Sequence, residues 1–257
     1  RDNCPTAIHP TANMRVFNIL TVSKNIFPKN FNINKNTLYI YWSENEHQSK
    51  FKLKWLRNNC YTELNNKKYT SPYIFWDGNL KKYFNKIKID HDKIVTDDNY
   101  LKKWLGLLHT YGFSIVKNAP TTKKSGFKIL KRISHYRETF FGTPFEVINI
   151  PKPNNTAYTA QALRNHTDLP YFEYTPGYQF LHCLINNAKG GKSSVVDGFA
   201  AADYLRKNEK EVFKILTETY VKFKDNDYTQ KAIRIFHSPI ITLTKDNDFN
   251  DIRFSMA

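Results

Sequence analysis

The residues with the clearest chemical potential are His166 and Asp168, in the stretch "NHTDLPY" at 165–171. Side chains two residues apart in a strand project to the same side. One imidazole and one carboxylate would then supply two of the three ligands of a non-haem iron site, which takes two His and one carboxylate. The same stretch also suits an exposed turn, because Leu169-Pro170 would end regular strand pairing. Local spacing therefore leaves an iron site and a turn open.

The composition is that of a globular protein that contains one or two domains. The chain has 257 residues, of which 40% are hydrophobic, enough for a large core. It contains no apolar run of about 18 residues, so we expect no membrane partner. Cys4, Cys60 and Cys183 are odd in number and far apart, which favours a reducing compartment. We expect a cytoplasmic location, with a mitochondrial one as the alternative because a targeting peptide could precede Arg1.

The net charge of +16 raises the alternative of a nucleic-acid-binding module, which would need a contiguous positive face. The basic residues are spread along the whole chain, as on a solvated surface. We therefore expect no nucleic-acid partner.

The first part of the chain predicts a small β-rich domain over residues 1–85. Residues 38–56 alternate apolar and polar side chains around a polar connection, as a β-hairpin does. A shorter strand is expected at 14–20. The segment 65–98 is rich in Lys, Asn and Asp and predicts a connection with short helices.

The second predicted domain, residues 86–257, begins with helices and continues with strands. A helix is expected from Asn99 to Gly112, which suits a helix C-terminus, and another over 124–137. Asp197 is placed to cap a helix at 199–206. Short apolar runs that suit strands lie at 112–116, 146–150, 179–185, 193–198, 220–223, 233–236, 240–243 and 251–256. The order favours an α+β fold built around a β-barrel or sandwich.

An ordered series of short motifs gives the His-x-Asp pair its context. Residues 155–205 contain "AYT", "HTD", "PG", "LHC", "GG" and "VDGF" in this order, and weaker likeness extends from "RDNCP" to "IRF". The series resembles the γ-butyrobetaine dioxygenase and trimethyllysine dioxygenase family of carnitine-biosynthesis hydroxylases. "HTDLPY" followed by Pro-Gly is more similar to the γ-butyrobetaine branch, whereas "YF" and the "AA" after "VDGF" also occur in the trimethyllysine branch.

The resemblance implies a fold and a set of cofactors. The fold would be a small N-terminal domain followed by an incomplete double-stranded β-helix, or jelly roll. Fe(II) would be bound by His166 and Asp168, with 2-oxoglutarate as co-substrate and ascorbate as an accessory reductant. Leu181 would line the 2-oxoglutarate pocket, and Asn155 would contact the bound ligand.

The resemblance also implies a small-molecule partner with a quaternary ammonium group, and a homodimer is one expectation for the assembly. A trimethylammonium group donates no hydrogen bond and is recognised by aromatic faces. Phe141, Phe145 and Tyr158 match the family's aromatic cage, although Phe141 replaces a Tyr and Phe145 replaces a Trp. Core packing is the alternative for the pair Phe140 and Phe141.

Two further parts of the family pattern are incomplete in this chain. The family's third iron ligand is a downstream His followed by an Arg that binds 2-oxoglutarate, and neither is present. His182 and His237 are better explained as structural residues of their strands. We therefore expect a fragment of a longer enzyme, and expect this chain alone to turn over no 2-oxoglutarate; the alternative is an inactive relative that acts as a binding protein.

The N-terminal domain retains only part of a zinc site. The γ-butyrobetaine branch can bind zinc there through three Cys and one His, a set typical of structural zinc. Cys4 and His47 match two of these positions, and His9 could substitute for a third. Two or three ligands make an incomplete zinc site.

Overall fold

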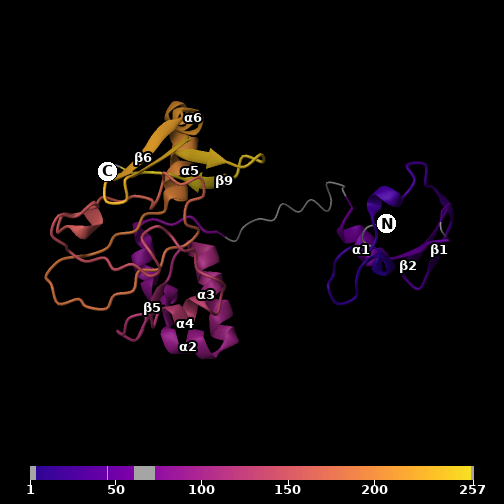
Figure 1. Cartoon of the computed structure of the whole chain (residues 1–257), viewed down its shortest axis with the longest axis horizontal. Helices are drawn as coiled ribbons and strands as arrows, with labels where there is room; N and C mark the ends of the chain where they lie inside the picture. The colour runs from indigo at the N-terminus through magenta and orange to yellow at the C-terminus, as the bar shows by residue number, and fades with distance from the viewer. Residues whose placement is uncertain (1–3, 45, 61–72, 256–257) are drawn as a thin grey trace. The chain divides into compact units, whose positions relative to one another are not determined.

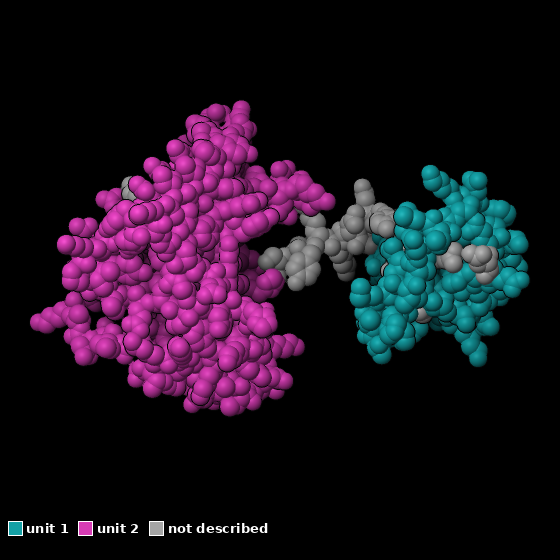
Figure 2. All heavy atoms as spheres, in the orientation of Figure 1, with its two compact units in different colours: residues 1–70 teal, residues 71–257 magenta. Residues whose placement is uncertain are grey.

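The computed structural model describes residues 4–44, 46–60 and 73–255. The chain divides into two compact units, residues 1–70 and 71–257, which Figure 2 colours separately. The predicted domain boundary after residue 85 stays a prediction; it falls in the 3-10 helix η3 (Gly78–Ile87), which leads into strand β4 (Lys88–Asp90) of unit 2.

Unit 1 is built on an antiparallel sheet of order β1-β2-β3 (Figure 1). The strands are β1 (Pro28–Asn34), β2 (Thr37–Trp42) and β3 (Gln48–Lys52). The predicted hairpin is confirmed for β2 and β3, whose register pairs Leu38 with Phe51. Its second strand ends earlier than predicted, because helix α1 (Leu53–Asn58) begins at Leu53.

The rest of unit 1 differs from the prediction. The strand expected at 14–20 is wrong: this region ends in a short 3-10 helix, η2 (Ile19–Thr21), whose first turn is capped by Asn18. Strand β1 was not predicted. It turns into β2 through Lys35 and Asn36, both with positive φ, as a two-residue hairpin requires.

Unit 2 begins with a parallel pair of strands joined by helices. Strands β4 and β5 (Ile115–Lys117) pair in parallel, and α2 (His91–Thr96) and α3 (Asp98–Tyr111) connect them. The predicted helix α3 is confirmed: Gly112 adopts the left-handed conformation that closes it, with φ of 73°. A buried core joins these elements through Ile89, Ile94, Trp104, Leu108 and Ile129. Of the helix predicted at 124–137, only α4 (Phe127–Leu130) forms.

Residues 131–197 are mostly irregular, and the strands predicted at 146–150, 179–185 and 193–198 do not form. A short 3-10 helix, η4 (Thr156–Tyr158), lies within this segment. The apolar runs were correctly found, but a strand also needs a partner, and in the described structure these runs pair with no other strand.

Regular structure resumes after this segment. Helix α5 (Gly198–Asn208) confirms the predicted helix, and α6 (Lys210–Glu218) was not predicted. Two antiparallel hairpins follow, formed by β6 (Val221–Asp227), β7 (Ala232–Ser238), β8 (Ile241–Leu243) and β9 (Phe249–Ile252). They lie beside α5 and α6 in Figure 1. The chain is thus a mixed α/β protein with several small sheets, and none of its described helices is long and apolar enough to cross a membrane.

Asp197 links α5 to a segment more than 100 residues earlier in the chain. Its buried carboxylate caps α5 by accepting a hydrogen bond from the Ala200 amide at 3.0 Å, as predicted. It also accepts from the Tyr73 hydroxyl at 2.7 Å and from the Trp76 amide at 3.0 Å. Burial, together with the carboxylate, raises the pKa of Tyr73, so this hydroxyl keeps its proton.

Replacing Asp197 by Ala should destabilise the protein more than loss of a helix cap alone. The substitution leaves the partly buried donors of Tyr73 and Trp76 without an acceptor, so the free energy of unfolding should fall by about 2–4 kcal/mol. Asp97→Ala is the matched control, because Asp97 is only partly buried and caps α3 by accepting an exposed hydrogen bond from the Asn99 amide; its loss should cost about 1 kcal/mol. Denaturant unfolding measures both, and equal losses would contradict the linking role.

Candidate metal site and its supporting contacts

His166 and Asp168 lie side by side, each about one-third exposed. The Nε2 atom of His166 is 3.0 Å from Oδ1 of Asp168. The other ring nitrogen, Nδ1, is 2.7 Å from the Arg164 carbonyl oxygen. Because a carbonyl can only accept, Nδ1 carries a proton, so Nε2 is the ring nitrogen that could bind a metal. Nε2 and the facing carboxylate oxygen are thus the two atoms of this pair that suit a metal ion.

The spacing of this pair fits a metal ion. Ligand atoms at about 2.1 Å from an octahedral ion are about 3.0 Å apart in adjoining positions, which is the separation between Nε2 and Oδ1. Among residues 4–44, 46–60 and 73–255, no third His, Cys, Asp or Glu joins the pair in a metal-binding group. The pair therefore suits two positions of a metal site.

The pair lies in a loop that is attached to the end of β9. The Thr167 amide donates to the Phe254 carbonyl at 2.8 Å, and the Phe254 amide donates back to the Thr167 hydroxyl at 2.9 Å. Leu169 follows with φ of 53°, a left-handed conformation that reverses the chain. The turn expected from the sequence thus follows directly after the pair, whereas the iron-binding role of His166 and Asp168 stays a prediction.

Gln179 orients the Asp168 carboxylate. Its side-chain amide donates to Oδ2, the oxygen that does not face His166. Sequence reasoning missed Gln179, because a single Gln eleven residues away carries no recognisable signal.

Two of the three predicted cage residues are in contact. The ring centroids of Phe141 and Phe145 are 5.2 Å apart, and Phe145 is 41% exposed. The ring centroid of Phe140 lies 4.1 Å from that of Phe141, so Phe141 also takes part in local packing. Tyr158 ends η4, and among the described residues no ring contact joins it to the other two. Its carbonyl accepts from the Ile150 amide at 3.1 Å.

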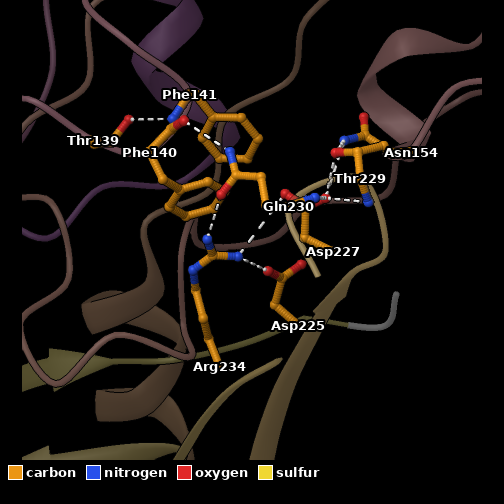
Figure 3. Close-up of polar contacts among 9 residues, drawn as sticks. All are labelled: Thr139, Phe140, Phe141, Asn154, Asp225, Asp227, Thr229, Gln230 and Arg234. Carbon is orange, nitrogen blue, oxygen red and sulfur yellow. Dashed lines mark hydrogen bonds and ion pairs between the residues drawn. The ribbon is translucent and has the colours of Figure 1, made fainter. Parts of the chain in front are cut away.

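The β6–β7 hairpin holds the segment that contains these aromatic residues, as Figure 3 shows. Gln230 donates to the Phe140 carbonyl at 3.1 Å. The Arg234 guanidinium lies 3.5 Å from the Phe140 ring centroid and pairs with Asp225 at 2.8 Å. An aromatic face here therefore already binds a cation.

The turn of the same hairpin holds the other end of that segment. Asn154 donates to the Thr229 hydroxyl at 3.1 Å, and the Tyr228 hydroxyl donates to the Pro153 carbonyl at 3.0 Å. Asp227 organises the turn by accepting from the amides of Thr229 and Gln230, seen beside Asn154 in Figure 3. The segment from Phe140 to Asn154 is thus attached to the hairpin at both ends.

The residues predicted to contact 2-oxoglutarate or bound ligand, and the two His predicted to be structural, also lie in unit 2. The Asn155 side chain accepts from the Ala157 amide at 2.9 Å and caps η4, and Leu181 is 75% exposed. His237 is exposed on β7. The ring of His182 lies beside Gly126, and its Nε2 is buried without a hydrogen-bond partner.

The predicted zinc residues lie in unit 1, close to β3. His47 directly precedes β3, and the buried Cys4 sulfur accepts from the Lys50 amide on that strand at 3.4 Å. Burial raises the pKa of the Cys4 thiol, but the hydrogen bonds with Thr6 and Lys50 lower this pKa by more than burial raises it. The pKa of Cys4 therefore lies below its ordinary value. Among the described side chains no three-ligand group forms here, so zinc binding stays a prediction.

The turn held by Asp227 should weaken in acid. Hydrogen bonds from the Thr229 side chain, and from the amides of Thr229 and Gln230, hold the pKa of Asp227 below its ordinary value. This stabilisation is fully present above the unfolded pKa of about 3.9 and is lost as the pH falls through the lower folded pKa. Unfolding free energies measured from pH 6 to pH 2 should therefore fall less steeply for Asp227→Asn than for the unchanged protein.

The exposed Asp246 provides a control, since Asp246→Asn should leave the slope of unfolding free energy against pH unchanged. A pH profile for Asp227→Asn that runs parallel to that of the unchanged protein would contradict the prediction.

Comparison with known proteins places the chain in a family. The model of the "Taurine catabolism dioxygenase TauD, TfdA family" matches residues 77–249, within unit 2. A γ-butyrobetaine dioxygenase of Pseudomonas sp. (strain AK-1) is 32% identical over 99% of this chain and 66% of its own length. Its human counterpart is 30% identical over 100% of this chain and 67% of its own length.

The trimethyllysine branch is similar over less of the chain. Human mitochondrial trimethyllysine dioxygenase is 32% identical over 86% of this chain and 53% of its own length. The chain thus spans about two thirds of the γ-butyrobetaine relatives and about half of the trimethyllysine relatives. The resemblance found in the sequence motifs is confirmed: this chain belongs to the TauD/TfdA dioxygenase family, together with the γ-butyrobetaine and trimethyllysine dioxygenases.

Proposed function

We propose that the whole protein is an Fe(II)- and 2-oxoglutarate-dependent dioxygenase that hydroxylates a trimethylammonium substrate. The observation that carries the proposal is the pairing of His166 Nε2 and Asp168 Oδ1 at 3.0 Å, while Nδ1 of the same ring faces the Arg164 carbonyl oxygen. This arrangement suits two ligands on one face of a non-haem iron ion. The dioxygenase names of the relatives agree with it.

In this proposal each residue of the site has one role. His166 and Asp168 bind Fe(II), which when bound supplies oxygen activation coupled to the conversion of 2-oxoglutarate to succinate. Gln179 holds Oδ2 of the carboxylate, so that Oδ1 faces the ion. Leu181 forms an apolar wall for 2-oxoglutarate, and Asn155 contacts bound ligand. Ascorbate serves as an accessory reductant.

The substrate that we favour is γ-butyrobetaine, with trimethyllysine as the alternative. The γ-butyrobetaine relatives match 99–100% of this chain, against 86% for the trimethyllysine relatives. Phe141 and Phe145, with Tyr158, would bind the trimethylammonium group, since a ring face attracts a cation that cannot donate a hydrogen bond. A binding protein without catalysis is a second candidate, because among the described residues no third His, Cys, Asp or Glu joins His166 and Asp168.

The proposal extends to fold and location. The barrel would be a jelly roll, to which the β6–β7 and β8–β9 hairpins contribute, preceded by the small N-terminal domain. The protein would act in the cytoplasm, or in mitochondria like the trimethyllysine relatives that are named for that compartment.

Metal binding by the chain tests the proposed site. Mn(II) replaces Fe(II) without oxidation, and its binding is followed by electron paramagnetic resonance of the free ion. His166→Ala and Asp168→Ala should each weaken binding by more than about tenfold, because even loss of a supporting residue outside the ligand shell costs 10–100-fold. His237→Ala, which changes an exposed imidazole on β7, should leave the affinity unchanged. Absence of Mn(II) binding by the unchanged chain would refute the site.

Calorimetric titration with γ-butyrobetaine tests the aromatic cage. Phe145→Trp should tighten binding and Phe145→Ala should weaken it, each about two- to fivefold, because Trp is the stronger cation–π partner. A neutral analogue with carbon in place of the quaternary nitrogen is the control, and Phe145→Trp should not improve its binding by a comparable factor. No heat with either γ-butyrobetaine or trimethyllysine would contradict the substrate assignment.

A further inference from the structure

Arg253 is a buried charged residue that directly follows β9. Only 5% of its surface is exposed. A buried guanidinium is costly unless its N–H groups find acceptors and its charge is balanced. The groups that satisfy Arg253 therefore indicate its role.

Three of its acceptors are backbone carbonyls of one short segment that follows Asp168. Nη1 donates to the Pro170 carbonyl at 3.0 Å and to the Phe172 carbonyl, and Nη2 donates to the Glu173 carbonyl at 2.6 Å. These contacts bind one side chain to the whole turn at 170–173.

The charge of Arg253 is balanced by Asp251, which is not part of that turn. Asp251 Oδ2 lies 3.1 Å from Nε, and the guanidinium carbon lies 4.5 Å from the Phe236 ring centroid on β7. The side chain is therefore fixed by the β7 and β9 strands while its Nη groups face the turn.

The residue before Asp168 is attached at the same place. Thr167 exchanges hydrogen bonds with Phe254, the neighbour of Arg253. Asp168 is thus held on both sides by residues 253–254. Leu169 between the attachments has φ of 53°, a strained conformation for a branched side chain that persists only when its surroundings enforce it.

We propose that Arg253 is a positioning residue for the metal site, through the backbone carbonyls at 170–173. By holding this turn it directs the Asp168 carboxylate toward His166. The inference rests on the proposed metal function of that pair. Lys cannot replace Arg here, because one ammonium group lacks the planar fork that binds separate carbonyls at once.

The test compares Mn(II) affinity with thermal stability for Arg253→Lys and Thr167→Val in the full chain. Arg253→Lys should weaken Mn(II) binding by about 10–100-fold, the range for residues that orient metal ligands, at temperatures where the variant is folded. Thr167→Val, which removes the acceptor of the Phe254 amide, should weaken binding in the same direction. The resonance spectrum of Mn(II) that remains bound should also change, which a loss of general stability would not produce.

Arg206→Met is the matched control. Arg206 also donates to a backbone carbonyl, of Asn247, pairs with Asp203 and lies 4.2 Å from the Phe249 ring centroid. None of these contacts involves residues 165–173. Its loss should leave Mn(II) affinity unchanged. Unchanged affinity and spectrum in both folded test variants would overturn the role of Arg253, whereas absence of binding by the unchanged chain would refute the metal site itself.

Discussion

The constraint on which the functional region depends is that residues 131–197 form little regular structure of their own. Backbone N–H and C=O groups outside helices and sheets still need partners. Here many of those partners come from side chains on the later hairpins. Gln230 binds the Phe140 carbonyl, and Arg253 binds three carbonyls after Asp168. The hairpins thereby give an irregular segment a defined path.

The two attachments share an Arg that lies over an aromatic ring and pairs with an Asp of the same hairpin: Arg234 with Asp225, and Arg253 with Asp251. Arg234 reaches the irregular segment through the face of the Phe140 ring and holds Gln230 within its own hairpin. Arg253 instead donates from its Nη groups directly to backbone carbonyls of that segment. A guanidinium suits this because its donors point in several fixed directions.

The predicted strands show why periodicity alone misjudged this region. Apolar runs at 179–185 and 193–198 have the composition of strands, yet a strand exists only when a neighbour supplies its hydrogen bonds. The runs at 220–223 and 233–236 have such neighbours, because a short turn brings them together as β6 and β7. Helix α3 was predictable because its hydrogen bonds, its Asp97 cap and its Gly112 end are all local.

The sequence by itself determined which residues could do chemistry. His166 and Asp168 are two residues apart, so their proximity is a local property, and the Asp197 cap is equally local. Tertiary structure decided what supports them. Gln179 at the carboxylate and Arg253, 83 residues along the chain from Pro170, are brought in by the path of the backbone. Contacts of that span follow from how the hairpins pack against an irregular segment, which no spacing in the sequence encodes.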